Sequence, residues 1–291
     1  MAPTLNSSKT DPEAPTPDTG NRPLGSHLPE ADRLRLSRPF SLPTPRGAAL
    51  WVIIAVVLGW AGMGAGINPD KLLNGIPNMG DFISRLFPPT FDKFGIIATL
   101  LIETLQMALV GTVLGALASL LLSFGAASNI SPRWVYTACR GILNVLRSIP
   151  ELIFALMFVS AVGLGPFAGI LAIVLGSVGS IGKVYAEAME SVQPGPVEAL
   201  TAVGANKRQV ISYAVLPQAA PLLVSYTLLL FEGNVRGATI LGLVGAGGIG
   251  LELTTAMRMY DYGHLCAIII SIIVLVTIID RISAFIRAKL S

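Results

Sequence analysis

The chain has 291 residues, of which 53% are hydrophobic and only 13% are charged, whereas an ordinary soluble domain has about 25% charged residues, so most classes of soluble enzyme are excluded. The formal net charge of +3 gives no basic excess that would support nucleic-acid binding. The two cysteines, Cys139 and Cys266, and the two histidines, His27 and His264, are too few and too widely separated for a disulfide framework, a redox motif or a metal motif.

The N-terminal segment differs in composition from the rest of the chain. Residues 1–46 hold nine of the twenty prolines and few large apolar residues, so we expect a disordered tail. A signal peptide is not indicated, because the first apolar run begins only at Ala48. That run continues without a charge to Ile67, and residues 47–67 are therefore predicted to form an uncleaved first transmembrane helix.

The remaining sequence predicts five further membrane-spanning helices. Residues 68–93 are of mixed polarity, contain four prolines and are expected to lie outside the bilayer on the extracytoplasmic side. The apolar runs that follow are long enough to span a membrane, and no strand-like alternation competes with them. They cover residues 94–124, 135–162, 166–185, 219–241 and 262–279. We therefore predict an all-α polytopic membrane protein with six spans.

Small residues recur at intervals of four along the second predicted span. They are Gly111, Gly115, Ser119 and Ser123. Such spacing places them on one helix face, where they allow another helix to approach closely.

The basic residues predict an orientation in the membrane. With the N-terminus inside, cytoplasmic segments hold 14 Lys and Arg residues and outer segments hold five, while Arg147 lies within a span. The positive-inside rule therefore places both termini and the connection at residues 186–218 in the cytoplasm.

This cytoplasmic connection predicts two short helices separated by a bend. Pro194-Gly195-Pro196 marks a turn, Val197–Val203 a short helix, Gly204 a sharp bend, and residues 206–215 a second short helix. The alternative is a plain surface loop, which would not require the large apolar residues of this segment. These are Leu200, Val203, Val210, Ile211, Val215 and Leu216.

The same segment carries a recognisable pattern. Glu198-Ala199, then Gly204, then Leu216-Pro217 resembles the EAA loop of ABC importer permeases, which inserts into a groove on an ATPase subunit. Leu200 stands where that loop commonly has a second alanine. The resemblance implies a coupling segment at residues 191–217. Its expected contact residues are Glu198, Ala199, Leu200, Gly204, Val210, Leu216 and Pro217.

Further motifs narrow the resemblance to the permease of phosphonate ABC importers. They are Arg147-Ser-Ile-Pro-Glu151, Gly163-Leu-Gly-Pro-Phe-Ala-Gly169, Gly182-Lys-Val-Tyr-Ala-Glu187, Phe231-Glu-Gly-Asn-Val-Arg236 and Gly242-Leu-Val-Gly-Ala-Gly-Gly-Ile-Gly250. The resemblance implies the fold of a type I ABC importer permease, similar to methionine importers, with a core at residues 94–291. It also implies import of phosphonates, phosphite or phosphate esters, with a permease for another substrate such as methionine as the alternative.

The resemblance also implies an assembly. We expect a homodimer around one path, two copies of a cytoplasmic ABC ATPase, an extracytoplasmic phosphonate-binding protein, and the lipid of a prokaryotic inner or plasma membrane. The chain contains no G-x-x-x-x-G-K-[ST] loop. It is therefore expected to be neither an enzyme nor the binder of a cofactor, with ATP and Mg²⁺ held by the ATPase.

Four polar residues are predicted to share one face of the third span. Arg140, Asn144, Arg147 and Glu151 are separated by four, three and four residues, so a continuous helix would align them in a stripe. A central arginine in lipid costs about 2.5–3.5 kcal/mol on insertion scales, which favours a stripe lining a translocation path. The alternative is an ion pair between Arg147 and Glu151 on one helix. Pro150 permits a kink beside them.

Polar residues and glycines also mark the fifth span. Glu232, Asn234 and Arg236 are expected near its outer end, either as part of an outer gate that meets an anion or as an intrahelical Glu232–Arg236 pair. Glu103 and Gln106 are expected to form hydrogen bonds between helices.

The glycine run after the fifth span matches G-x-G-x-x-G, but neither a preceding strand nor a following ribose-binding acid accompanies it, so we exclude a dinucleotide site. We expect a tight turn at the outer side that contributes to a gate. Its key residues are Gly245, Gly247 and Gly248.

Two other classes of protein fit less well. An ion-driven secondary transporter predicts inverted repeats with interrupted helices, which the sequence does not display, and would leave the coupling segment without a purpose. An intramembrane enzyme would need a histidine metal motif or a Gly-x-Ser-x-Gly motif, and the chain has neither.

Overall fold

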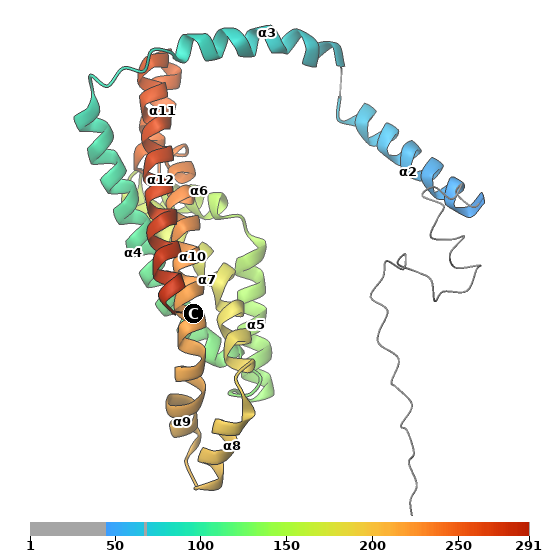
Figure 1. Ribbon diagram of the computed structural model, residues 1–291, viewed down its shortest axis with the longest axis vertical. Coiled ribbons are helices and arrows are strands. Elements are labelled where there is room, and N and C mark those ends of the chain that lie inside the picture. Colours follow the sequence, from blue (N-terminus) through green and yellow to red (C-terminus); the bar gives the residue numbers. More distant parts are fainter. Residues whose placement is uncertain (1–44, 67–68, 291) are drawn as a thin grey trace, which may run out of the picture. The chain divides into compact units, whose positions relative to one another are not determined.

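The computed structural model describes residues 45–66 and 69–290, and all regular elements among them are helices. The expected tail falls almost entirely on residues 1–44, which lie outside the described residues. The chain divides into two compact units, the first ending at Leu73 and the second beginning at Asn74. Helices α4 to α12 of the second unit form an elongated bundle (Figure 1).

The predicted number of spans agrees with the helices in the described part of the chain. Five stretches are long and apolar enough to cross a membrane, and a bent pair makes a sixth. The five stretches include α2 (Pro45–Gly64), α4 (Phe94–Ala126), α7 (Pro166–Glu190), α10 (Leu216–Gly242) and α12 (Tyr262–Leu290). The bent pair is α5 (Arg133–Ser148) and α6 (Glu151–Val162). The prediction of an all-α membrane protein is therefore confirmed.

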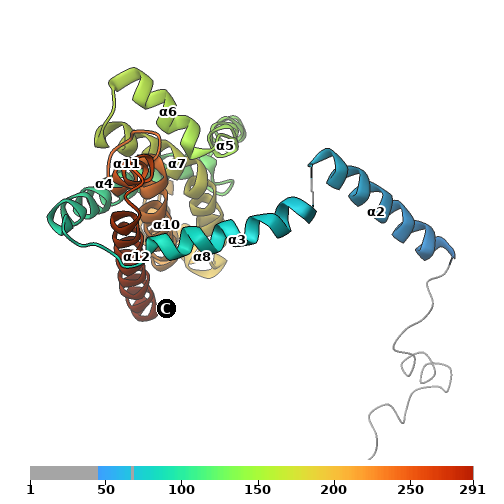
Figure 2. The same cartoon turned by 90° about the horizontal axis from the view of Figure 1, so that it is seen from above.

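Close contact between α4 and α7 forms the centre of the bundle. A Cβ atom added to Gly111 would lie 2.5 Å from the Ile173 side chain, and one added to Gly115 would lie 2.5 Å from Ser177. The two serines of the predicted small-residue stripe are fully buried. Viewed from above (Figure 2), α5 and α6 lie on one side of α7, while α10 and α12 lie on the other.

The third span is not a single helix over residues 135–162, as the sequence analysis expected. The axes of α5 and α6 differ by 86°. Pro150 provides no amide hydrogen for a helix and disfavours helical backbone in the preceding residue, and Ile149 is indeed extended, with φ −95° and ψ 119°. Residues before and after this bend therefore do not share one face.

The fifth span begins earlier than predicted. The short α9 (Lys207–Val210) continues through a π-helical turn, η1 (Ile211–Val215), directly into α10, so that one helical stretch has 36 residues. In the π-helical turn the amide of Leu216 donates to the carbonyl of Ile211. This wider turn lies just before Pro217, which lacks an amide hydrogen. The predicted second short helix is thus the first part of a long one.

The segment at residues 68–93 contains a helix that the sequence analysis did not predict. Helix α3 (Pro69–Leu86) includes Pro77 in its interior, and this proline obscured the helical pattern. Exposed apolar residues recur at helical spacing, among them Ile76 and Ile83. At its C-terminal end the ring of Phe82 packs edge-on against Tyr262, with ring centroids 5.6 Å apart.

We predict that close backbone contact between α5 and α7 contributes to the stability of the fold. A Cβ atom at Gly179 would lie 2.7 Å from the backbone nitrogen of Arg147, so Gly179→Ala should lower the free energy of unfolding by about 1–3 kcal/mol. Gly141→Ala in α5 is the matched control, because its Cβ would meet no atom within 4 Å and alanine favours a helix. Thermal unfolding in detergent measures both. Equal stability of the two variants would contradict the packing described.

Candidate translocation path and coupling segment

The coupling segment consists of a short helix, a bend and a capped second helix. Helix α8 (Pro194–Ala202) is followed by Gly204, whose φ of +84° favours glycine. The Asn206 side chain accepts a hydrogen bond from the Gln209 amide, and the Gln209 side chain accepts one from the Asn206 amide. This capping box starts α9. In Figure 1 the segment lies at the end of the bundle opposite α11.

Most of the coupling segment is accessible. Helix α8 has no buried residue. Val203 is 79% exposed and Tyr213 is 74% exposed. Among the predicted coupling residues, Glu198, Ala199, Gly204 and Pro217 are exposed, whereas Leu200, Val210 and Leu216 are partly buried. Exposed apolar side chains at the tip of a helical hairpin suit contact with another protein.

The predicted polar stripe of the third span is not continuous, because its four members lie in different environments. The guanidinium of Arg140 pairs with Glu190 at 3.0 Å and donates to the carbonyl of Ala126. Because this ion pair joins α5 to the C-terminal end of α7, Arg140 has a structural role. Asn144 and Arg147 are exposed on α5.

Glu151 lies beyond the bend, at the start of α6. Its carboxylate approaches α7 and α10, since a Cβ atom at Gly237 would lie 3.4 Å from its Oε2. Its Oε1 is buried and has no hydrogen-bond partner in the described part of the chain. The ion pair between Arg147 and Glu151 that the sequence left as an alternative is not among the ion pairs of the described residues, because the bend separates the two side chains.

Asn234 belongs to a buried polar cluster and not to a gate at the surface. Its side-chain nitrogen donates to the hydroxyl of Thr112 at 2.8 Å and to that of Ser177 at 3.0 Å. The cluster joins α10 to α4 and α7 at the centre of the bundle. Sequence reasoning missed Thr112 and Ser177. Each of them directly follows a glycine that packs tightly against a neighbouring element, Gly111 and Gly176 respectively, and this pattern could have identified them.

The intrahelical pair between Glu232 and Arg236, one of the two alternatives that the sequence left open, is not formed. Glu232 pairs with Arg287 at 2.5 Å, and Arg236 pairs with Asp280 at 2.7 Å. Both partners lie in the second half of α12, so Glu232 and Arg236 are far from the end of the bundle at which α12 begins, which the sequence analysis took as the outer end. The sequence analysis placed them there because it took α10 to cross the whole membrane, whereas a further helix, α11 (Ile249–Arg258), follows the glycine run.

The glycine run forms a tight turn inside the bundle. Gly245, Gly247 and Gly248 have φ values of +88°, +86° and +73°, which favour glycine. The amide of Gly248 donates to the carboxylate of Glu103 at 2.8 Å, and the next amide, of Ile249, donates to the Thr104 hydroxyl at 2.9 Å. The expected turn and the expected interhelical bond of Glu103 are therefore present.

This turn lies deeper than the outer surface where it was predicted. Helix α11 starts beside Thr104 and ends close to Asp261, which pairs with Lys93 at the start of α4. It therefore runs antiparallel to the first part of α4, and the turn lies about ten residues along that helix. Helix α10 ends at this turn, and α11 continues the chain beyond it.

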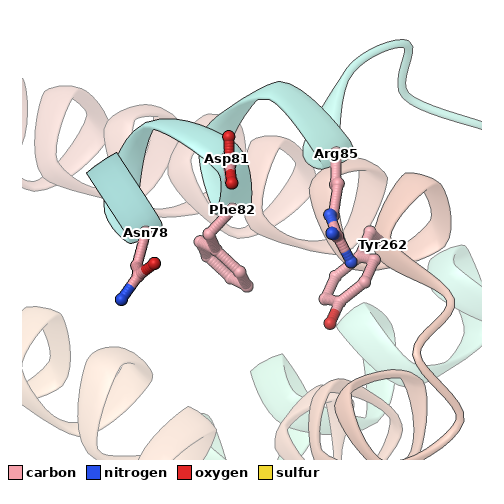
Figure 3. A pocket seen from close by; sticks show the side chains of 5 residues that line it. All are labelled: Asn78, Asp81, Phe82, Arg85 and Tyr262. Atoms are coloured by element: carbon pink, nitrogen blue, oxygen red, sulfur yellow. The ribbon is translucent and has the colours of Figure 1, made fainter. Parts of the chain in front are cut away.

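A separate cavity of about 240 Å³ lies where α3 meets the start of α12 (Figure 3). Figure 3 shows Arg85 and Phe82 of α3 next to Tyr262. The lining holds both an acidic residue, Asp81, and a basic one, Arg85, along with Asn78. Among the described residues no cluster of His, Cys, Asp and Glu side chains could hold a metal ion.

Apolar spans, a glycine turn between α10 and α11 and an exposed helical hairpin at α8 and α9 characterise a polytopic helical membrane protein. The family model of the binding-protein-dependent transport system inner membrane component matches residues 111–291. The chain belongs to this family, which comprises permease subunits of ABC importers.

Two relatives are similar to this chain in sequence, and one solved structure is similar to it in fold. The chain is 39% identical to the phosphite transport system permease protein PtxC of Stutzerimonas stutzeri, over 89% of this chain and 95% of that protein. It is 42% identical to the phosphate-import permease protein PhnE of Mycolicibacterium smegmatis, over 77% of this chain and 42% of that protein. The inward-facing methionine ABC transporter MetNI matches with a TM-score of 0.62 and 23% identity, covering 69% of this chain and 99% of that one. This last match shows the fold.

We predict that the Glu232–Arg287 pair is important for stability. Glu232 is only 8% exposed, so Arg287→Ala leaves a buried carboxylate without its cation and should cost about 3–5 kcal/mol of the free energy of unfolding. Adding Glu232→Gln to that variant should restore part of the loss. Lys289→Ala, two residues further along α12, is the control. If Arg287→Ala and Lys289→Ala unfold at the same temperature, the pair does not carry this role.

Proposed function

We propose that this chain is the transmembrane subunit of an ATP-driven importer of phosphorus oxyanions, a class that includes phosphonates, phosphite, phosphate and phosphate esters. The supporting observation is the 39% identity to a phosphite permease over nearly the whole of both chains. The methionine transporter shares the fold at only 23% identity, so it gives no comparable support for methionine as substrate.

The proposed assembly contains two copies of the chain, two copies of a cytoplasmic ATPase and one extracytoplasmic binding protein. One coupling segment per chain matches one ATPase per chain, which a two-fold symmetric pair satisfies. The exposed α8 and Tyr213 supply the surface for the ATPase. The excess of Lys and Arg in the segments assigned to the inside supports cytoplasmic termini.

The substrate assignment is tested by reconstituting the chain with its ATPase and binding protein in proteoliposomes. We expect ATP-dependent uptake of radiolabelled phosphite, phosphate or methylphosphonate, and no uptake of labelled methionine. Each candidate is measured with and without ATP, which separates pumping from leak. Uptake of methionine without uptake of any phosphorus oxyanion would overturn the assignment and leave the permease fold intact.

A second prediction concerns the bend of the coupling segment. Gly204 has a φ of +84°, and no atom lies within 4 Å of a Cβ placed there, so a substitution acts through backbone strain and not through a clash. Gly204→Val should therefore uncouple ATP hydrolysis from uptake, since a β-branched residue disfavours this conformation. Gly204→Asn is the matched control, because asparagine tolerates it. The readout is the ratio of transported substrate to hydrolysed ATP. An unchanged ratio in Gly204→Val would refute the coupling role of the bend.

A further inference from the structure

Helix α5 has a polar face and an apolar face, and both are exposed in the single chain. The apolar face includes Trp134, Ile142 and Val145, which are 76%, 50% and 61% exposed. The polar residues cluster on the opposite side at helical spacing. They are Arg133, Thr137, Arg140, Asn144, Arg147 and Ser148. We call four of the exposed residues, Thr137, Asn144, Arg147 and Ser148, the α5 polar face; Arg133, at the start of the helix, is also exposed.

The α5 polar face reaches the middle of the membrane-spanning bundle. The backbone of Arg147 packs against Gly179, which lies 13 residues after Pro166 and 11 residues before Glu190, the two ends of α7. Arg147 is therefore near the midpoint of a span. An exposed polar face at this depth is unfavourable in hydrocarbon, so it must contact water or protein.

The charge of Arg147 is not neutralised within the described part of the chain. No hydrogen bond or ion pair of its guanidinium occurs among those residues. Arg140, two turns earlier, is already paired with Glu190. Glu151 approaches α7 and α10 from beyond the bend. Arg147 thus combines an available positive charge with a fixed position on a rigid helix.

We propose that the α5 polar face lines the aqueous path of the importer and that Arg147 is its contact for the passing oxyanion. This inference rests on the proposed function. A guanidinium presents parallel N–H donors that match two oxygens of a phosphoryl group, and it is more weakly hydrated than an ammonium. Asn144 and Ser148 add neutral hydrogen-bonding groups beside it. Arg147 is the one charged residue among the four that make up the α5 polar face, so this face attracts an anion.

Which face of α5 contacts water is tested with cysteine variants at two adjacent positions. Asn144→Cys lies on the α5 polar face, and Val145→Cys lies on the apolar face, yet both positions are exposed in the single chain. They are made in a variant of the full complex in which Cys139 and Cys266 are replaced by alanine. A water-soluble methanethiosulfonate should modify position 144 at least about tenfold faster than position 145, because thiolates form in water and not in lipid.

The charge of the path is tested with anionic and cationic reagents of similar size. Residues 144 and 147 are neighbours on one helix face, so Arg147 should make the thiol introduced by Asn144→Cys react about tenfold faster with the anionic reagent than with the cationic one. Arg147→Gln in the same protein should abolish this preference, and Arg147→Lys should retain it. Phosphite, supplied with the binding protein and ATP, should slow the reaction.

The outcomes separate this inference from the proposed function. Equal, slow labelling at both positions would show a face covered by protein or lipid, and an anionic preference that persists in Arg147→Gln would show that Arg147 is not its source. Either result overturns the inference even if the complex imports phosphite. If the complex imports no phosphorus oxyanion while labelling behaves as expected, the proposed substrate fails and the aqueous face remains.

Discussion

Backbone groups in the hydrocarbon region must find hydrogen-bond partners within the protein, and this requirement explains where the helices of the bundle break. The turn between α10 and α11 leaves amides without helical partners, and side chains of α4 replace those partners. Glu103 accepts from Gly248, and Thr104 accepts from Ile249. The interruption is therefore tolerated only because α4 lies directly against it. Gly247 of the same turn packs tightly against the backbone of Pro166 at the start of α7.

The break at Pro150 depends on the same kind of support. There the chain turns by 86° beside α7, and only glycine at position 179 lets the end of α5 approach that closely. The bend sends α6 across the bundle and leaves the polar side of α5 uncovered by its own chain. A structural requirement for close packing thus also determines which polar groups are available for contact with water or with a second copy.

Much of this fold could be predicted from local sequence patterns. The number of spans follows from the length and composition of apolar runs, and the helix and bend of the coupling segment follow from prolines, glycine and the capping residue Asn206. The small-residue stripe of α4 likewise identified a real helix contact. These features depend on residues close together in the chain, where spacing alone carries the information.

The partners of the charged residues could not be predicted in this way. Glu232 has an arginine four residues away, yet it pairs with Arg287, 55 residues further along, because α12 lies beside α10. The predicted stripe failed for a related reason, since helical spacing was extended through Pro150 into a segment of different direction. Helix α3 was missed because the interior Pro77 was given more weight than the apolar spacing around it.

One long helix connects the two parts of the bundle that matter most for the proposed importer. The stretch from Lys207 to Gly242 has 36 residues, which corresponds to about 54 Å at 1.5 Å per residue. It starts after the bend of the coupling segment and ends at the glycine turn, and the Asn234 cluster fixes its last third to α4 and α7. In the proposed importer, a force that the ATPase applies at this bend has a continuous helical route to the turn. The π-helical segment near its start is the part of this route where the regular α-helical hydrogen bonding is altered.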